Sequence, residues 1–423
     1  MIQQLKKTVS GLQTLSGLTL FACLPMFFSG VTRISMLMFI GLSIVEYFLD
    51  KRYQYSQFFT LHKAPFWACI AYFLLLIIYA PFEQDTQHLP LFIESRSAFL
   101  IFGVLGLLDT KVPPAKYLAG IAIGMSTILI AYTLYLAYSQ APEVVTNWQK
   151  HIILTRHTNI HAHMAFNMYL NVAMTACFWF IKQYKSWFTR VALTLLIVLF
   201  YSAVAYSNAR TGFVASNIII MAGIIYLLWD KQKILVVSAT VLLAIVGGTL
   251  ILNNHKVEKM LSTQKDVRYD IWIESVSLLK QAPLLGVGAS TNVEHLIDVF
   301  LDSPYIIRDR ALIDSCLHPD ISGAHPHNQL LQSSMEFGLL GVLSMLGILL
   351  LPIAYMVKYK CNLVLLTFWS VIVIQLQTEV IRGSLGDYAF CLYLLFAMYY
   401  AQQSSKKVVG SMQGHDQLPS TSR

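Results

Sequence analysis

Charged side chains are scarce in this sequence. Asp, Glu, Lys and Arg make up only 12% of its 423 residues, whereas 56% are hydrophobic. An ordinary globular chain is about 25% charged. The net charge of +8 does not indicate a nucleic-acid-binding protein, because the basic residues are scattered between apolar runs instead of forming one patch. The composition therefore predicts a membrane protein with many spans.

Paired cysteines and strong metal-binding motifs are also missing. Of the six cysteines, only Cys316 falls in a long polar loop, and it has no partner there, so we expect no structural disulfide. No HExxH motif occurs. The pairs His161/His163 and His325/His327 could supply imidazole ligands, but histidines at alternate positions are weak evidence for a metal site. We expect no metal and no cofactor, with a metal site as the alternative.

Twelve apolar segments each approach the roughly 20 residues that a membrane helix needs. The N-terminal segment follows a basic MIQQLKK and resembles a signal peptide, but it lacks a clear cleavage site and is interpreted as a retained first helix. We expect nine spans in 1–252, a large loop in 253–333, three spans in 334–402 and a disordered cytoplasmic tail in 403–423. The segments are 11–28, 33–49, 65–81, 96–109, 117–138, 163–181, 191–207, 212–229, 234–252, 334–355, 363–379 and 388–402.

Basic residues in the short loops predict the orientation. With the N-terminus in the cytoplasm, 17 of the 30 Lys and Arg residues fall on the cytoplasmic side, whereas the short loops of the other side hold only four arginines. Long loops count less in the positive-inside rule. Both termini are therefore expected in the cytoplasm. The loop 253–333 is expected to face outward, as are ten of the twelve histidines.

Single arginines mark the short outward loops. Arg96 lies at the mouth of the fourth expected span, Arg210 in a tight SNARTG turn, and Arg382 between the last two spans. An arginine at a membrane margin often only extends to lipid headgroups. Together these arginines could instead form a fixed cationic cluster, because the guanidinium matches phosphate oxygens and keeps its charge.

The large outward loop contains an expected amphipathic helix. Trp272, Val276 and Leu279 recur at helical spacing after Arg268, and Pro283 ends the pattern. Such a helix could simply lie on the membrane surface. The functional alternative is that it presents Arg268 to a site on the outward face.

A histidine-bearing segment runs directly into the tenth expected span. Pro326 restricts how far a helix extends back, which places His327 near the helix start at the water–lipid boundary. An unperturbed imidazole has a pKa of about 6.5 and suits proton transfer; the alternative is that His327 only caps the helix. Gly338 and Gly341 predict a flat face against a neighbouring helix. Glu336 could simply pair with an arginine.

These motifs resemble the O-antigen ligase, O-antigen polymerase and pilin O-oligosaccharyltransferase superfamily. The resemblance covers roughly residues 190–390, with Arg96 as a weaker match. One departure is the Ala-Arg-Thr sequence at 209–211 in place of the commoner Ser-Arg. The matching residues are Ser207 to Arg210; Arg268, Trp272, Pro283, Gly286 and Gly288; His327, Asn328, Gly338 and Gly341; and Arg382 with Gly383.

The resemblance implies a GT-C-type glycosyltransferase of about twelve membrane helices in the bacterial inner membrane. Its active site would face the periplasm, and it would transfer a glycan from undecaprenyl pyrophosphate to a hydroxyl of lipid A–core without a metal. His327 would be the general base, or alternatively a phosphate ligand. The pyrophosphate would be bound by Arg210 and Arg268, together with Arg382 and Arg96. The supporting positions are Asn328, Glu336, His325 and His163.

Three other activities stay open. A polymerase or a pilin glycosyltransferase would use the same residues and donor with a different acceptor; the length and lack of an added C-terminal domain favour the ligase. A transporter needs a substrate site near the middle of the membrane. The spans here are nearly free of charge and the polar residues gather on one face, which favours the transferase.

Overall fold

The computed structural model describes residues 2–23, 29–50, 60–83, 89–140, 163–206, 210–228, 267–289, 326, 328–377 and 383–415. Within these ranges the protein is helical and contains no β-strand. The helices are α1 (Ile2–Cys23), α2 (Ser29–Asp50), α3 (Ala64–Tyr79), α4 (Leu89–Leu107), α5 (Ala115–Gln140), α8 (His163–Gln183), α9 (Trp187–Tyr206), α10 (Arg210–Leu228), α13 (Val267–Gln281), α16 (Gln329–Lys358), α17 (Leu363–Gln375) and α18 (Gly383–His415), with short 3₁₀ turns at Leu61–Lys63 and Ala80–Phe82.

Every expected apolar segment except 234–252 overlaps a described helix, and 234–252 lies outside the described residues. In the described part of the chain, six helical segments are long and apolar enough to cross a membrane, and α17 is apolar but only 13 residues long. The protein is therefore a multi-helix membrane protein. The number twelve stays a prediction. The six segments are Gly30–Leu49, Leu61–Phe82, Ala115–Tyr135, Trp187–Ala205, Thr211–Leu228 and Gln329–Lys358.

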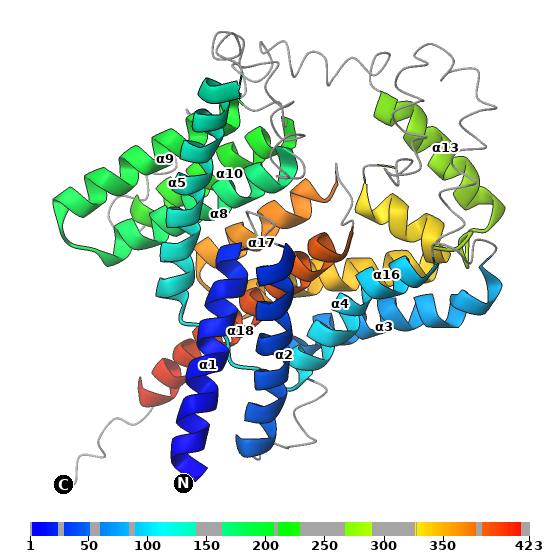
Figure 1. Ribbon diagram of the computed structural model, residues 1–423, viewed down its shortest axis with the longest axis horizontal. Helices are drawn as coiled ribbons and strands as arrows, with labels where there is room; N and C mark the ends of the chain where they lie inside the picture. Colours follow the sequence, from blue (N-terminus) through cyan, green and yellow to red (C-terminus); the bar gives the residue numbers. More distant parts are fainter. Residues whose placement is uncertain are drawn as a thin grey trace, which may run out of the picture.

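The helices form two packed groups. Pairs α1–α2 and α3–α4 lie side by side, α16 packs on α3, and α18 packs on α4 (Figure 1). Their buried side chains, with Trp369 of α17, form one large apolar core around Phe99 and Tyr393. Helices α8, α9 and α10 form a second core around Phe200, and α17 contacts both α8 and α16. The long helix α16 thus contacts α3 of the first group, α17, and the loop helix α13.

Two expected features of the polar segments differ from the structure. Helix α13 ends at Gln281, just before Pro283, as predicted, but its buried residues are Ser275 and Leu278, and Val276 is exposed. The buried face of α13 therefore includes Ser275 and Leu278, one residue before the expected Val276 and Leu279. Helix α18 continues through residues 403–415, where we expected a disordered tail; residues 416–423 lie outside the described part.

Candidate functional site

The N-terminus of α16 is capped and attached to the end of α17. The Asn328 side-chain oxygen accepts hydrogen bonds from the backbone N–H groups of Leu330, at 2.9 Å, and Leu331, at 3.1 Å. The Asn328 amide nitrogen donates to the carbonyl of Gln377 at 3.1 Å. Asn328, and not its histidine neighbour, therefore supplies the N-cap, which satisfies two backbone donors at the helix start.

Both sequence neighbours of His327 are held by hydrogen bonds. His327 and His325 lie outside the described residues, but Pro326 is buried and its carbonyl accepts a hydrogen bond from Trp272 Nε1 at 2.5 Å. Asn328, on the other side, caps α16. Pro326 is therefore bonded to α13, and Asn328 is bonded to α16 and to the chain just after α17.

The hydrogen bond between Trp272 and Pro326 also brings the backbone of Arg268, on the same helix, toward Pro326. Arg268 precedes Trp272 by four residues on α13, so the two positions share one face of the helix. The side chain of Arg268 is outside the description. Figure 1 shows α13 beside the first turns of α16. Two motifs that are about 60 residues apart in sequence thus meet in one structural unit.

Helix α16 is broken within the motif, and the turn after α13 fills the break. Phe337 and Gly338 have non-helical backbone angles. Val287 N–H donates to the Met335 carbonyl at 2.7 Å, and Gly288 N–H donates to the Glu336 carbonyl at 3.2 Å. In return, Leu339 N–H donates to the Pro283 carbonyl at 3.0 Å. The turn therefore replaces backbone hydrogen bonds that the break removes from α16, which buried peptide groups require.

Glycine is required at this junction. Gly286, Gly288 and Gly338 have φ angles of +73°, +105° and +58°, which L-residues rarely adopt. A Cβ on Gly338 would overlap the backbone of Leu284, and one on Gly341 would overlap the Ser333 carbonyl. The expectation that Gly338 and Gly341 form a flat face for a neighbouring helix was therefore wrong. They allow the break and its contact with the turn.

A buried ionic cluster lies next to the break. Arg96 Nη2 lies 2.9 Å from Glu336 Oε1, and Arg96 Nη1 lies 2.7 Å from Asp387 Oδ1. Tyr72 donates to Glu336 Oε2 at 2.5 Å, and Ser95 donates to Asp387. Both carboxylates are fully buried and the Arg96 side chain is only 5% exposed. Helices α3, α4, α16 and α18 are therefore joined by one polar network.

This network changes the interpretation of Arg96. One alternative from the sequence was that Glu336 simply pairs with an arginine, and the structure confirms it. Asp387 was not anticipated, because neither sequence spacing nor apolar periodicity links it to a residue 291 positions away. With two carboxylates in contact, the Arg96 guanidinium is compensated inside the protein. Its geometry favours a role in holding the helices together over direct contact with a phosphate.

The Arg210 and His163 positions lie at neighbouring helix starts. Helix α8 begins at His163 and α10 begins at Arg210, with both side chains outside the description. The Asn171 side chain on α8 donates to the Gly212 carbonyl on α10 at 3.3 Å. Close packing is required at Gly212, where a Cβ would lie 2.7 Å from Asn167 Cβ. The structure thus places these two helix ends side by side.

Other parts of the predicted site lie outside the described chain or carry no described metal ligands. Arg382 and residues 207–209 lie outside the described residues. In the described ranges no group of three or more His, Cys, Asp or Glu side chains could hold a metal ion. Sequence reasoning also missed Glu83, whose carboxylate accepts the Ala289 N–H at the end of the turn. Its position directly after the third span gave no signal of that contact.

Comparison with known proteins agrees with the spaced motifs. Residues 193–346 match the protein family described as O-antigen ligase. A 209-residue stretch is 26% identical to an uncharacterized protein of Haemophilus influenzae (strain ATCC 51907 / DSM 11121 / KW20 / Rd) and covers 44% of this chain and 48% of that protein. The chain therefore spans about half the length of that relative. The matched region contains Arg210, α13, the turn and the break in α16. The match over residues 193–346 confirms the resemblance to the O-antigen ligase family that the motifs indicated.

Proposed function

We propose that this protein is an O-antigen ligase of the bacterial inner membrane. It transfers a glycan from undecaprenyl pyrophosphate to a hydroxyl of lipid A–core on the periplasmic face. The observation that carries the proposal is the junction of α13, the 282–289 turn and the start of α16, which lies inside the region matching the family. At this junction Pro326, the residue before His327, is hydrogen-bonded to the helix that carries Arg268, which supports the proposal.

Arginines bind the donor pyrophosphate in this proposal. The bond between the anomeric carbon and the phosphate oxygen breaks, and its electron pair leaves on the lipid pyrophosphate. Fixed positive groups at that oxygen stabilise the developing charge. Arg210 and Arg268 supply them, with Arg382 from the last outward loop. Arg210 begins α10, and the positive end of the helix dipole adds to its charge at the same place.

His327 is the general base. The acceptor hydroxyl oxygen forms the new bond to the anomeric carbon and loses its proton to the imidazole. A positioned base typically contributes 10²–10⁴-fold to such a reaction. The anchoring of Pro326 and Asn328 supports this role, because a catalytic side chain needs a fixed backbone to keep its geometry.

Arg96 and Glu336 support the site indirectly. The cluster of Arg96, Glu336 and Asp387 holds α16 immediately before its break. The turn after α13 is hydrogen-bonded to α16 at this break. Asn328 acts as the cap of α16. His163 and His325 remain supporting positions on the expected outward side of the membrane. In this assignment Arg96 is a positioning residue, not a phosphate ligand.

The donor-site assignment is tested by conservative substitution. Arg210→Lys and Arg268→Lys keep the charge but lose the guanidinium geometry, so each is expected to recover little of the transfer that the alanine variants lose. The controls are the membrane level of each variant and Arg33→Lys, at an exposed arginine on α2. Full activity in both lysine variants would reduce these residues to simple charges.

The reaction is proposed to need no metal. Transfer by the purified protein is expected to persist in excess EDTA. Loss of transfer that a divalent cation restores would instead identify the pairs His161/His163 and His325/His327 as ligands.

The ligase is separated from its alternatives by the lipopolysaccharide of a strain that lacks this protein. A ligase mutant makes lipid A–core with no attached polymer, whereas a polymerase mutant keeps core carrying one glycan unit. Loss of glycan on pilin alone would indicate a pilin glycosyltransferase. Lipid flipping by reconstituted protein, without transfer, would indicate a transporter.

A further inference from the structure

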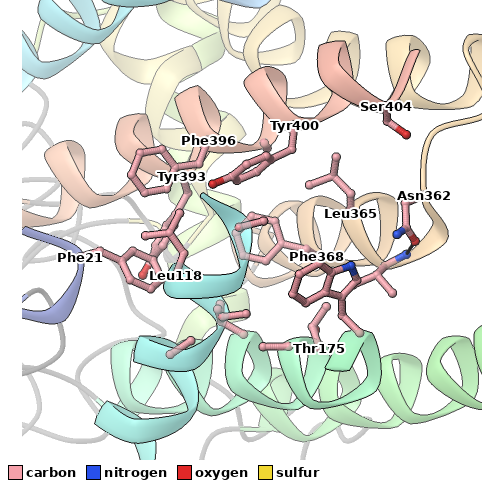
Figure 2. Close-up of a pocket in the computed structure, with 18 of the residues that line it drawn as sticks. Phe21, Leu118, Thr175, Asn362, Leu365, Phe368, Tyr393, Phe396, Tyr400 and Ser404 are labelled. Atoms are coloured by element: carbon pink, nitrogen blue, oxygen red, sulfur yellow. Dashed lines mark hydrogen bonds between the residues drawn. The ribbon is translucent and has the colours of Figure 1, made fainter. Parts of the chain in front are cut away.

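An apolar cavity of about 320 Å³ lies between α5, α8, α17 and α18, and none of the residues used above for catalysis lines it. Its walls are aliphatic and aromatic side chains, among them Leu118, Leu365, Phe368 and Phe396 (Figure 2). Among the described residues, no charged side chain lines it. Ligand pockets typically measure about 300–1,000 Å³, and a surface of this kind suits a hydrocarbon chain.

The end of the cavity at Asn362 carries its amide side chains and is the more polar end. Figure 2 places Asn362 and Ser404 at one end of the cavity, and Phe21 and Tyr393 at the other. Gln403 adds a further amide beside Ser404. A molecule with a hydrocarbon chain and a polar headgroup would therefore enter in one orientation, with its headgroup near Asn362 and Ser404.

Two lysines are related to that polar end, Lys182 through its contacts with Tyr226 and Lys360 by its position two residues before Asn362. Lys182 Nζ donates to the Tyr226 carbonyl at 3.1 Å and lies 4.4 Å from the centre of the Tyr226 ring. The Asn362 amide, which lines the cavity, donates to the hydroxyl of the same Tyr226 at 3.5 Å. Lys360 is exposed two residues before Asn362. All of these residues belong to loops or helix ends that the distribution of basic residues predicts to be cytoplasmic.

We propose that this cavity binds an anionic phospholipid of the cytoplasmic leaflet. One acyl chain occupies the apolar part, and the phosphate lies near Asn362, Lys182 and Lys360. Charge complementarity selects the occupant, since anionic lipids are attracted to basic residues at this surface. The donor headgroup of the proposed reaction lies on the other face of the membrane, so this lipid site is independent of the proposed transfer.

The test measures lipid binding by the purified, delipidated full-length protein in neutral detergent. Native mass spectrometry gives the Kd for phosphatidylglycerol and for phosphatidylcholine, and thermal unfolding gives the accompanying rise in Tm. Phosphatidylglycerol is expected to bind more tightly. Lys182→Gln and Lys360→Gln should each weaken it about fivefold, which corresponds to the usual contribution of one basic residue near an anionic surface. Lys7→Gln, at an exposed lysine on α1, is the matched control and should change nothing.

Filling the cavity tests the acyl-chain position. Ala176 on α8 and Ala122 on α5 both line it. Ala176→Phe should abolish the phosphatidylglycerol-dependent rise in Tm while the Tm without lipid stays near that of the wild type. Ala122→Phe, from the opposite wall, serves if the first variant does not fold.

Three outcomes would overturn the proposal: equal affinity for the two phospholipids, an unchanged Kd in both lysine variants, or displacement of phosphatidylglycerol by undecaprenyl phosphate. The last would assign the cavity to a polyisoprenyl chain. Because glycan transfer is not the readout, failure of the proposed function would leave this result unaffected.

Discussion

Arg96 and Glu336 form an ion pair of 2.9 Å in the interior of the protein, although 240 positions separate them in the sequence. The pair joins α4 to α16 one residue before the break at Phe337 and Gly338. Ionisable residues within membrane helices are costly unless they are paired, and they mark sites under constraint. The pair thus fixes the part of α16 that binds the turn after α13.

Removing Arg96 should destabilise the protein more than it damages donor binding directly. Arg96→Leu leaves Glu336 and Asp387 buried without their cation, and breaking a buried pair in this way typically costs about 3–5 kcal/mol. Denaturant unfolding in detergent and the membrane level of the variant measure the effect. Arg33→Leu, at an exposed arginine on α2, should cost little. A variant of normal stability that no longer binds the donor would return Arg96 to the pyrophosphate site.

Substitution of Gly338 should disrupt the junction. Gly338→Ala places a Cβ against the backbone of Leu284 at a φ of +58°, and such backbone strain costs about 1–3 kcal/mol. Lower stability and loss of transfer are both expected. Gly120→Ala is the control, since a Cβ at Gly120 on α5 meets nothing within 4 Å. Equal behaviour of the two variants would mean that the break in α16 is not required.

The hydrogen bond from Trp272 should matter for transfer. Trp272→Phe keeps an aromatic ring but removes the Nε1–H that bonds the Pro326 carbonyl. A net loss of about 1 kcal/mol predicts a decrease of about fivefold in transfer, with the protein still folded. Trp187→Phe, at an exposed tryptophan on α9, should leave transfer unchanged. Wild-type transfer in Trp272→Phe would show that α13 does not position the histidine segment.

The sequence allowed the helices to be predicted better than their contacts. Apolar runs of the right length identified the described spans, and Pro283 predicted the end of α13 at Gln281. The contact of Arg96 with Asp387 left no local pattern, because it depends on the packing of α4 against α18. Spacing alone also could not distinguish a glycine that allows helix packing from Gly338, whose backbone angles break α16.

Reporter fusions test the orientation on which the account depends. Fusions at Lys185 and Lys358 should report the cytoplasm and a fusion at Asp302 the periplasm, because the basic residues of the short loops predict that arrangement. A cytoplasmic signal at Asp302 would place the proposed site in the wrong compartment.

The most direct measurement is glycan transfer by purified protein in proteoliposomes that contain an undecaprenyl-pyrophosphate-linked glycan and lipid A–core. The wild-type protein should produce lipid A–core carrying the glycan. His327→Ala should bind the donor normally but lose about 10²–10⁴-fold in transfer, and wild-type transfer should decline toward acidic pH as the base becomes protonated. Lost donor binding in His327→Ala, with no acid decline in the wild type, would make His327 a phosphate ligand. Transfer onto a second lipid-linked glycan, or no transfer despite bound donor, would contradict the proposed ligase activity.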